Sequence, residues 1–104
     1  MKRAVILSTS RTPLCKSWKG SLNQTHGATL GGCVVEESIK RGAVNPDEIE
    51  DVILGCAYPE GATGENIARQ VVLRAGLPVK VPGMTINRFC SSGLQAVAIA
   101  SQRI

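Results

Sequence analysis

Cys90 is the residue of this chain whose type and position are best suited to covalent chemistry. It stands between a strand-like segment, 84–87, and an apolar run that begins at Ser91, so we predict that it lies at a strand-to-helix junction. Unpaired backbone N–H groups and the positive end of a helix dipole stabilise a thiolate, which is the nucleophilic form of cysteine. The same N–H groups can stabilise an oxyanion that develops on a thioester carbonyl. The junction therefore indicates a nucleophile together with part of an oxyanion hole.

The three residues after Cys90 have types that suit such a junction. Ser91 or Ser92 can cap the helix through its hydroxyl, and Gly93 would let a ligand or a neighbouring backbone approach closely. The junction alone leaves a structural role open, because a free cysteine is most often a small buried hydrophobic residue. A thiol-sensing role is less favoured, since no resolving cysteine lies near Cys90 in the sequence.

The remaining cysteines and the single histidine predict neither a metal site nor a disulfide framework. Cys15, Cys33 and Cys56 form no C-x-x-C pair, and His26 is the only histidine of the chain. We therefore expect free thiols in a reducing, cytoplasmic compartment. Cys33 within a helix and Cys56 at a strand end are interpreted as packing residues, and His26 as a solvated loop residue.

The composition indicates an ordinary globular chain that forms one small domain at most. Of the 104 residues, 43% are hydrophobic and 19% are charged, which excludes the disordered and collagen-like classes. The net charge of +4 comes from scattered basic residues without interleaved aromatic side chains, so we expect no nucleic-acid partner. The apolar run at 4–7 is too short to span a membrane, and we expect no membrane span.

Alternating strand and helix patterns must position Cys90. Short apolar runs predict buried strands and periodic apolar residues predict helices, in the order 4–7 (strand), 29–41 (helix), 52–56 (strand), 65–75 (helix), 84–87 (strand) and 91–104 (helix). Gly42 is expected to end the first helix, and Asn45 to cap a short turn over 46–48. The last helix is apolar almost all round, which is typical of a helix enclosed by protein, and it carries no stop signal. This alternation predicts an α/β fold with a parallel sheet.

The residues around Cys90 also resemble a known family motif. The run 87–96, Asn-Arg-Phe-Cys-Ser-Ser-Gly-Leu-Gln-Ala, is similar to the acyl-enzyme cysteine motif of the thiolases. It is nearer to the degradative 3-ketoacyl-CoA thiolases than to the biosynthetic acetoacetyl-CoA type. The similarity covers nearly the whole chain, since it extends to the segments 11–13, 20–22, 64–70 and 75–78.

The resemblance implies that residues 1–104 are a partial thiolase N-terminal domain, truncated within its last helix. The expected fold is α/β and thiolase-like, with three helix/sheet/helix layers and the element order β-α-β-α-β-α of an incomplete N-terminal half. By the same resemblance, Cys90 is the nucleophile and acyl carrier, and its backbone N–H is one oxyanion donor. The residues that bind coenzyme A are not identified.

The implied activity is thiolytic cleavage of a 3-ketoacyl-CoA to acyl-CoA and acetyl-CoA, or the reverse Claisen condensation, through an acyl-cysteine intermediate. Coenzyme A is then a substrate, and neither a permanently bound cofactor nor a metal is expected. A homodimer or homotetramer in the cytoplasm is also implied.

The resemblance further implies catalytic residues that this chain does not contain. Thiolases use an activating histidine, a second cysteine as acid and base, and a further histidine or asparagine at the other oxyanion hole. None of these matches a residue among the 104, so we expect the chain to be inactive without the remainder of the fold. Two alternatives stay open: an acetoacetyl-CoA-forming biosynthetic thiolase, and a non-catalytic fragment or subunit that binds a complementary chain.

Overall fold

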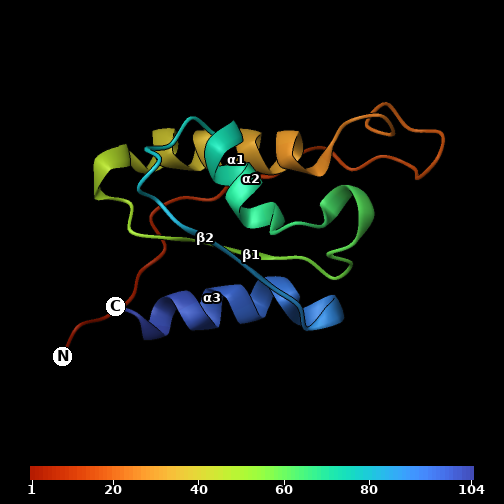
Figure 1. The fold of residues 1–104 in the computed structure, drawn as a ribbon. Coiled ribbons are helices and arrows are strands. Elements are labelled where there is room, and N and C mark those ends of the chain that lie inside the picture. The colour runs from red at the N-terminus through yellow and green to blue at the C-terminus, as the bar shows by residue number, and fades with distance from the viewer.

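A computed structural model describes residues 1–104, and it consists of three layers (Figure 1). The elements in chain order are α1 (Gly27–Gly42), η1 (Pro46–Glu48), β1 (Val52–Gly55), η2 (Gly61–Thr63), α2 (Ile67–Arg74), β2 (Gly83–Ile86), η3 (Phe89–Ser91) and α3 (Ser92–Gln102). Helices α1 and α2 cover one face of the sheet and α3 covers the other. The predicted α/β architecture of helix, sheet and helix is confirmed.

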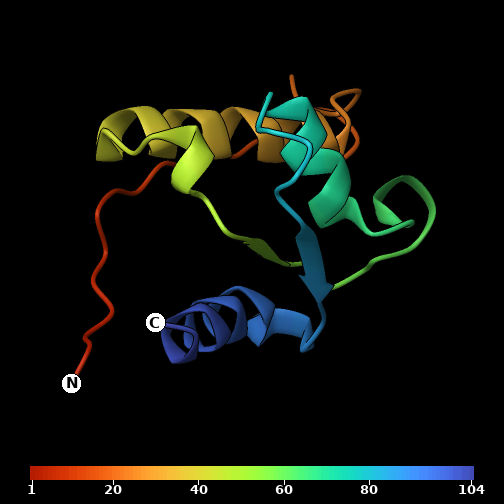
Figure 2. The same ribbon diagram turned by 60° about the vertical axis from the view of Figure 1, so that its left-hand side comes forward.

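The sheet consists of β1 and β2, which pair in parallel and are joined by the crossover helix α2. Val52 lies opposite Gly83, and Gly55 lies opposite Ile86. One further hydrogen bond, from the N–H of Cys56 to the carbonyl of Ile86 at 2.9 Å, extends the ladder beyond β1. Because parallel strands end at the same edge, both carboxyl ends lie near the point where the chain turns into α3 (Figure 2).

Helix α1 is longer than predicted at both ends. His26 is exposed, as expected of a loop residue, but its Nδ1 accepts a hydrogen bond from the N–H of Ala28 at 3.0 Å and so caps the helix. At the other end Gly42 is still helical, and the left-handed residue is Ala43 with φ of 50°. The helix extends this far because the N–H groups of Ala43 and Val44 both return to carbonyls of its last turn.

The strand predicted over residues 4–7 does not form. The three apolar side chains Val5, Ile6 and Leu7 are each more than two-thirds exposed, and the sheet contains only β1 and β2. Side-chain hydrogen bonds instead attach the following residues to α1: Ser8 Oγ donates to the carbonyl of Ser38 and Ser10 Oγ to that of Val34, both at 2.6 Å. Figure 2 shows this segment extended and separate from both strands. Its apolar pattern suits a strand, but here its backbone has no ladder partner.

Helix α3, whose composition is typical of an enclosed helix, is covered on one side only within this chain. Ala96 faces the sheet with 7% of its surface exposed, whereas Leu94 and Val97 are 75% and 56% exposed. Only one layer contacts α3, because α1 and α2 both lie on the opposite face of the sheet (Figure 1). The outer face of α3 is therefore an apolar surface without a partner in this chain.

The core is small and centres on α2. Val71 and Val72 are fully buried, and they belong to two clusters that pack against Val35 of α1. Gly31 of α1 permits the close approach of Val71, since a Cβ atom on Gly31 would lie 2.5 Å from Cγ2 of Val71. Helix–helix packing thus fixes α2, and α2 in turn contacts both strands. None of the three α-helices has the length and apolar character that crossing a membrane requires.

Candidate active site

Cys90 lies in η3, a 3-10 helix of one turn between the end of β2 and the start of α3. The predicted strand-to-helix junction is therefore confirmed. Cys90 is exposed, and its thiol takes part in no hydrogen bond. The alternative of a buried packing cysteine is thereby excluded within this chain. An exposed thiol at the N-terminal end of an 11-residue helix is free to contact a ligand.

The turn that presents Cys90 has an unusual backbone. Phe89 has φ of 45°, in the left-handed region that residues with a Cβ atom rarely adopt. The Oδ1 atom of Asn87 accepts the N–H of Phe89 at 2.8 Å, which closes an Asx turn directly before the cysteine. Ser91 Oγ donates to the carbonyl of Arg88 at 3.0 Å. Side chains on both sides of Cys90 therefore hold the turn, while Cys90 itself contributes no side-chain bond.

The two serines after Cys90 do not have the role predicted for them. Neither Ser91 nor Ser92 forms a side-chain cap at the start of α3. Ser92 Oγ instead accepts the N–H of Arg88 at 2.8 Å and donates to the carbonyl of Phe89 at 2.7 Å. The side chain returns into the turn that precedes the helix because Ser92 is 4% exposed and cannot reach solvent.

The close backbone approach that the sequence suggested at Gly93 occurs at Gly55 instead. A Cβ atom on Gly55 would lie 2.4 Å from the carbonyl carbon of Ser92 and 2.6 Å from the nitrogen of Gly93. The space around a Cβ atom on Gly93 is open to 4 Å. Gly55 therefore lets the start of α3 rest directly on β1, whereas a side chain at Gly93 would meet open space. The sequence signal for this approach is a glycine at the end of an apolar strand.

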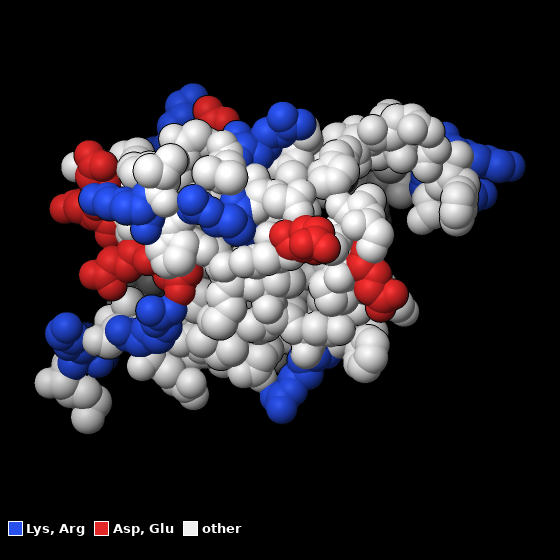
Figure 3. Space-filling view, in the orientation of Figure 1, with Lys and Arg blue, Asp and Glu red and all other residues white.

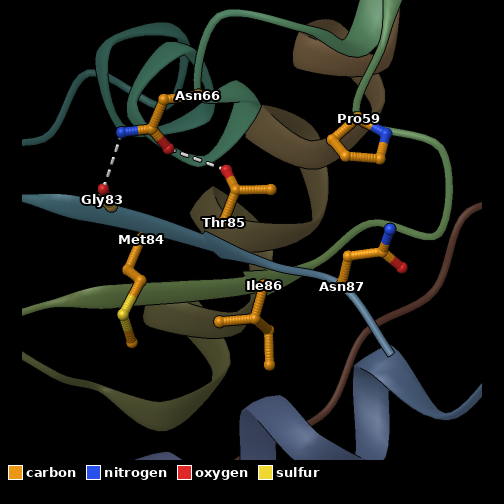
Figure 4. Close-up of a pocket in the computed structure, with 7 residues that line it drawn as sticks. All are labelled: Pro59, Asn66, Gly83, Met84, Thr85, Ile86 and Asn87. Carbon is orange, nitrogen blue, oxygen red and sulfur yellow. Dashed lines mark hydrogen bonds between the residues drawn. The ribbon is translucent and has the colours of Figure 1, made fainter. Parts of the chain in front are cut away.

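A second polar network, which sequence reasoning missed, ties α2 to β2 beside this turn. Asn66 Nδ2 donates to the carbonyl of Gly83 at 3.0 Å, and Asn66 Oδ1 accepts the hydroxyl of Thr85 at 2.7 Å (Figure 4). Thr85 Oγ1 also accepts the N–H of Ala68 at 3.0 Å. Glu65 and Asn66 both have left-handed φ values, of 54° and 52°, so α2 begins at Ile67 rather than at Glu65 as predicted.

An open hollow of about 390 Å³ lies beside β2, next to this network (Figure 4). It is lined by Pro59, Asn66, Gly83, Met84, Thr85, Ile86 and Asn87. Asn87, at one end of the hollow, is also the residue that closes the turn before Cys90. The hollow therefore adjoins residues 87–91, the turn that presents Cys90, hereafter the presentation turn. Cys90 itself does not line the hollow.

The other candidate thiols lie elsewhere in the fold. Cys33 is exposed on α1, so its interpretation as a packing residue is wrong. Cys56 packs against the core cluster around Val71, as predicted. Cys15 accepts a hydrogen bond from the N–H of Leu22 at 3.3 Å within the loop before α1. All four cysteines are free thiols, and no group of three or more His, Cys, Asp or Glu side chains is placed to hold a metal ion.

The charges around the site are sparse. Arg88 Nη1 donates to Gln95 Oε1 at 2.5 Å, which places a guanidinium beside the turn of Cys90. On the face in Figure 3, basic and acidic side chains are intermixed over the helical layer of α1 and α2, whereas few charged side chains lie over α3. No histidine or carboxylate side chain is hydrogen-bonded to Cys90. The arrangement therefore exposes the Cys90 thiol and places no hydrogen-bonded base beside it.

Comparison with known proteins assigns the chain to one family. The model of the family described as "Thiolase, N-terminal domain" matches residues 4–104. The chain is 48% identical over 104 residues to the 3-ketoacyl-CoA thiolase of Bacillus subtilis (strain 168), covering 100% of the chain and 27% of that relative. It is 40% identical over 103 residues to an acetyl-CoA acetyltransferase of Syntrophomonas wolfei, covering 99% of the chain and 26% of the relative. A beta-ketoadipyl-CoA thiolase of Acinetobacter baylyi is also 40% identical, over 105 residues, with 26% of its length covered. The chain thus spans about a quarter of the curated relatives that it matches.

Proposed function

This chain belongs to the thiolase family, matching its N-terminal domain, and from that premise we propose that Cys90 is the nucleophile and acyl carrier of a coenzyme A-dependent acyltransferase. The observation that supports the role most directly is the position of Cys90, which is exposed in the turn directly before α3. The proposed reaction is thiolytic cleavage of a 3-ketoacyl-CoA, or the reverse Claisen condensation.

In the cleavage direction, the Cys90 thiolate attacks the C3 carbonyl of the substrate, and the bond between C2 and C3 breaks. The electron pair of that bond remains on C2, which takes up a proton to give acetyl-CoA, and the acyl group remains on sulfur as a thioester. The thiolate of a second coenzyme A then attacks this thioester, which releases acyl-CoA and regenerates the Cys90 thiolate. The Cys90 backbone N–H would stabilise the oxyanion of the thioester steps. Coenzyme A is a substrate here, and the scheme uses neither a metal nor a permanently bound cofactor.

The catalytic acid and base of this scheme must come from outside the 104 residues. The thiol of Cys90 has no hydrogen-bonded histidine or carboxylate, and an uncoupled thiol is a weaker nucleophile at neutral pH than one paired with a base. We therefore propose that the chain is active only together with the remainder of the thiolase fold. The exposed face of α3, with Leu94 and Val97, is the surface that this remainder would cover.

The cleavage direction is favoured by the 48% identity to a relative named as a 3-ketoacyl-CoA thiolase. An acetoacetyl-CoA-forming thiolase is the alternative within the family, since relatives named as acetyl-CoA acetyltransferases are 40% identical. A non-catalytic fragment or subunit that binds a complementary chain is the alternative of a different class, and the uncovered face of α3 favours it. A homodimer or homotetramer in the cytoplasm completes the proposal.

The test uses a completed enzyme, in which this chain replaces the matched N-terminal segment of the Bacillus subtilis 3-ketoacyl-CoA thiolase. Thiolysis is followed as loss of a 3-ketoacyl-CoA in the presence of coenzyme A, and the acylated peptide is identified by mass spectrometry. The substitution Cys90→Ala should lower kcat by about 10⁴-fold or more and remove the acyl adduct. The matched control is Cys33→Ala, which removes another exposed thiol and should leave both unchanged.

Retention of transfer by the Cys90→Ala enzyme, or an acyl adduct on a different cysteine, would refute the nucleophile assignment. The fragment alternative is tested by mixing the 104-residue chain with the remainder of the relative expressed separately. Activity that appears on mixing, and that is absent from either piece, supports the need for a complementary part; full activity of the chain by itself contradicts it.

A further inference from the structure

We propose that Ser92 is a positioning residue for Cys90, whose buried hydroxyl holds the turn that presents the thiol. The inference rests on the proposed function, because it concerns the nucleophile of that reaction. Ser92 is the one buried polar residue of the chain, with 4% of its surface exposed, so its hydroxyl is not open to solvent. Its role is therefore exerted through the backbone of the residues that precede Cys90.

The hydroxyl of Ser92 spans the cysteine with two hydrogen bonds. It accepts the N–H of Arg88 at 2.8 Å and donates to the carbonyl of Phe89 at 2.7 Å. Both partners come before Cys90 in the chain and Ser92 comes after it, so the bonds close a ring around the nucleophile. A hydroxyl has one proton to donate, and here donor and acceptor capacities are both used within the turn.

The turn needs such a closure because of the backbone of Phe89. A residue with a Cβ atom at φ of 45° costs free energy and persists only where its surroundings hold it. The Asn87 side chain holds the N–H side of Phe89, and Ser92 holds its carbonyl side. If either bond is lost, Phe89 can relax towards negative φ, and the orientation of the next residue, Cys90, changes with it.

Ser92 can act as a fixed point because its own backbone is anchored. A Cβ atom on Gly55 would lie 2.4 Å from the backbone carbonyl carbon of Ser92. Gly55 belongs to β1, which pairs with β2. The hydroxyl therefore links the presentation turn to the sheet rather than to a mobile side chain. Ser91, by contrast, is exposed, and its hydroxyl reaches only the carbonyl of Arg88.

The test measures kcat and KM separately in the completed enzyme described above. The substitution Ser92→Ala removes both bonds and should lower kcat by about 10- to 100-fold with KM changed by less than about twofold, because substrate binding does not use this hydroxyl. Ser92→Thr keeps a hydroxyl and should restore most of kcat. The control Ser101→Ala removes an exposed hydroxyl from the same helix, remote from Cys90, and should have no effect.

A second measurement follows the thiol directly in the 104-residue chain. The rate at which iodoacetamide alkylates Cys90 is divided by the rate for Cys33, which is an exposed internal reference on α1. Ser92→Ala should shift this ratio by about threefold or more towards the ratio of the chain unfolded in urea. Ser92→Thr should restore the ratio of the unsubstituted chain.

The outcomes separate this inference from the proposed function. If Cys90→Ala abolishes transfer but Ser92→Ala leaves both kcat and the alkylation ratio unchanged, the positioning role is wrong and the nucleophile assignment stands. A loss of kcat in Ser92→Ala that accompanies loss of the cooperative unfolding transition also overturns the positioning role, since Ser92 is then a folding residue. If Cys90→Ala retains transfer, the nucleophile assignment fails, and the proposed role of Ser92 fails with it.

Discussion

The substitution Gly55→Ala tests whether α3 is positioned by direct backbone contact with β1. The added methyl group would lie 2.4 Å from the carbonyl carbon of Ser92, with the carbonyl oxygen of Ser92 and the nitrogen of Gly93 both at 2.6 Å. All three are backbone atoms at the start of a helix, so no side-chain rotation can relieve the contact. The start of α3 must move away from β1 by about 1 Å to reach ordinary van der Waals contact.

The cost follows from this displacement. Forcing an extra methyl group into a packed contact destabilises a protein by about 1–3 kcal/mol, and the rigidity of both partners places Gly55→Ala near the upper end. Replacing glycine also lowers the entropy of the unfolded chain, which returns about 0.5 kcal/mol. We therefore expect a net loss of about 2 kcal/mol in the free energy of unfolding.

The matched control is Gly93→Ala, which adds the same methyl group on the other side of the contact. A Cβ atom there meets nothing within 4 Å, and Gly93 lies inside α3, so this change should stabilise the chain by about 0.5–1 kcal/mol. Urea unfolding of both variants, followed by circular dichroism, gives the two values. Equal effects of the two substitutions, or a stabilising effect of Gly55→Ala, would refute the contact as the structure has it.

The remaining predictions concern side chains whose hydrogen bonds replace regular structure, and each is measured as a change in the free energy of unfolding. His26→Ala removes the acceptor that caps α1 and should cost about 1 kcal/mol, whereas His26→Ser should retain most of the stability; equal losses in both would contradict the cap. Asn66→Ala removes the bonds to Gly83 and Thr85 and leaves a left-handed residue unsupported, so a loss of about 2–3 kcal/mol is expected, and Asn66→Gly should lose less. Arg69→Lys removes the paired hydrogen bonds from the guanidinium to the carbonyls of Val79 and Val81 and should lower the free energy of unfolding by about 1–2 kcal/mol. An unchanged free energy of unfolding would contradict this role.

The helices were predictable because their signals are local. The apolar period of α1, the capped turn at Asn45 and the glycine with φ of 71° after α2 are all properties of consecutive residues. The side chain of Asn45 caps η1 as predicted, accepting the N–H of Asp47 at 3.1 Å. Boundaries shifted by up to two residues: α1 begins earlier because His26 caps it, and α2 begins later because Glu65 and Asn66 are left-handed.

The first strand and the enclosure of α3 were not predictable in the same way. An apolar run indicates that a segment can be buried. Burial also requires a second element that covers the segment, and the run does not indicate which element that is. Residues 4–7 and the outer face of α3 both have such patterns, and both are exposed in this chain. The chain spans about a quarter of the relatives that it matches, and neither of these two surfaces is covered within it.

The sequence by itself determined the family and the place of Cys90, the proposed nucleophile, between a strand and a helix, because these depend on residue types in consecutive positions. Tertiary structure decided how Cys90 is held: Ser92 returns into the turn rather than capping α3, and the glycine that permits close backbone contact is Gly55 of β1 rather than Gly93 of α3. The physical reason is that Ser92 is buried by its contact with Gly55, which is distant in the chain, and this burial decides which of the nearby backbone groups its hydroxyl bonds. The packing of α3 on β1 brings Ser92 to Gly55 and buries its hydroxyl. The buried hydroxyl then forms its hydrogen bonds within the turn that holds Cys90.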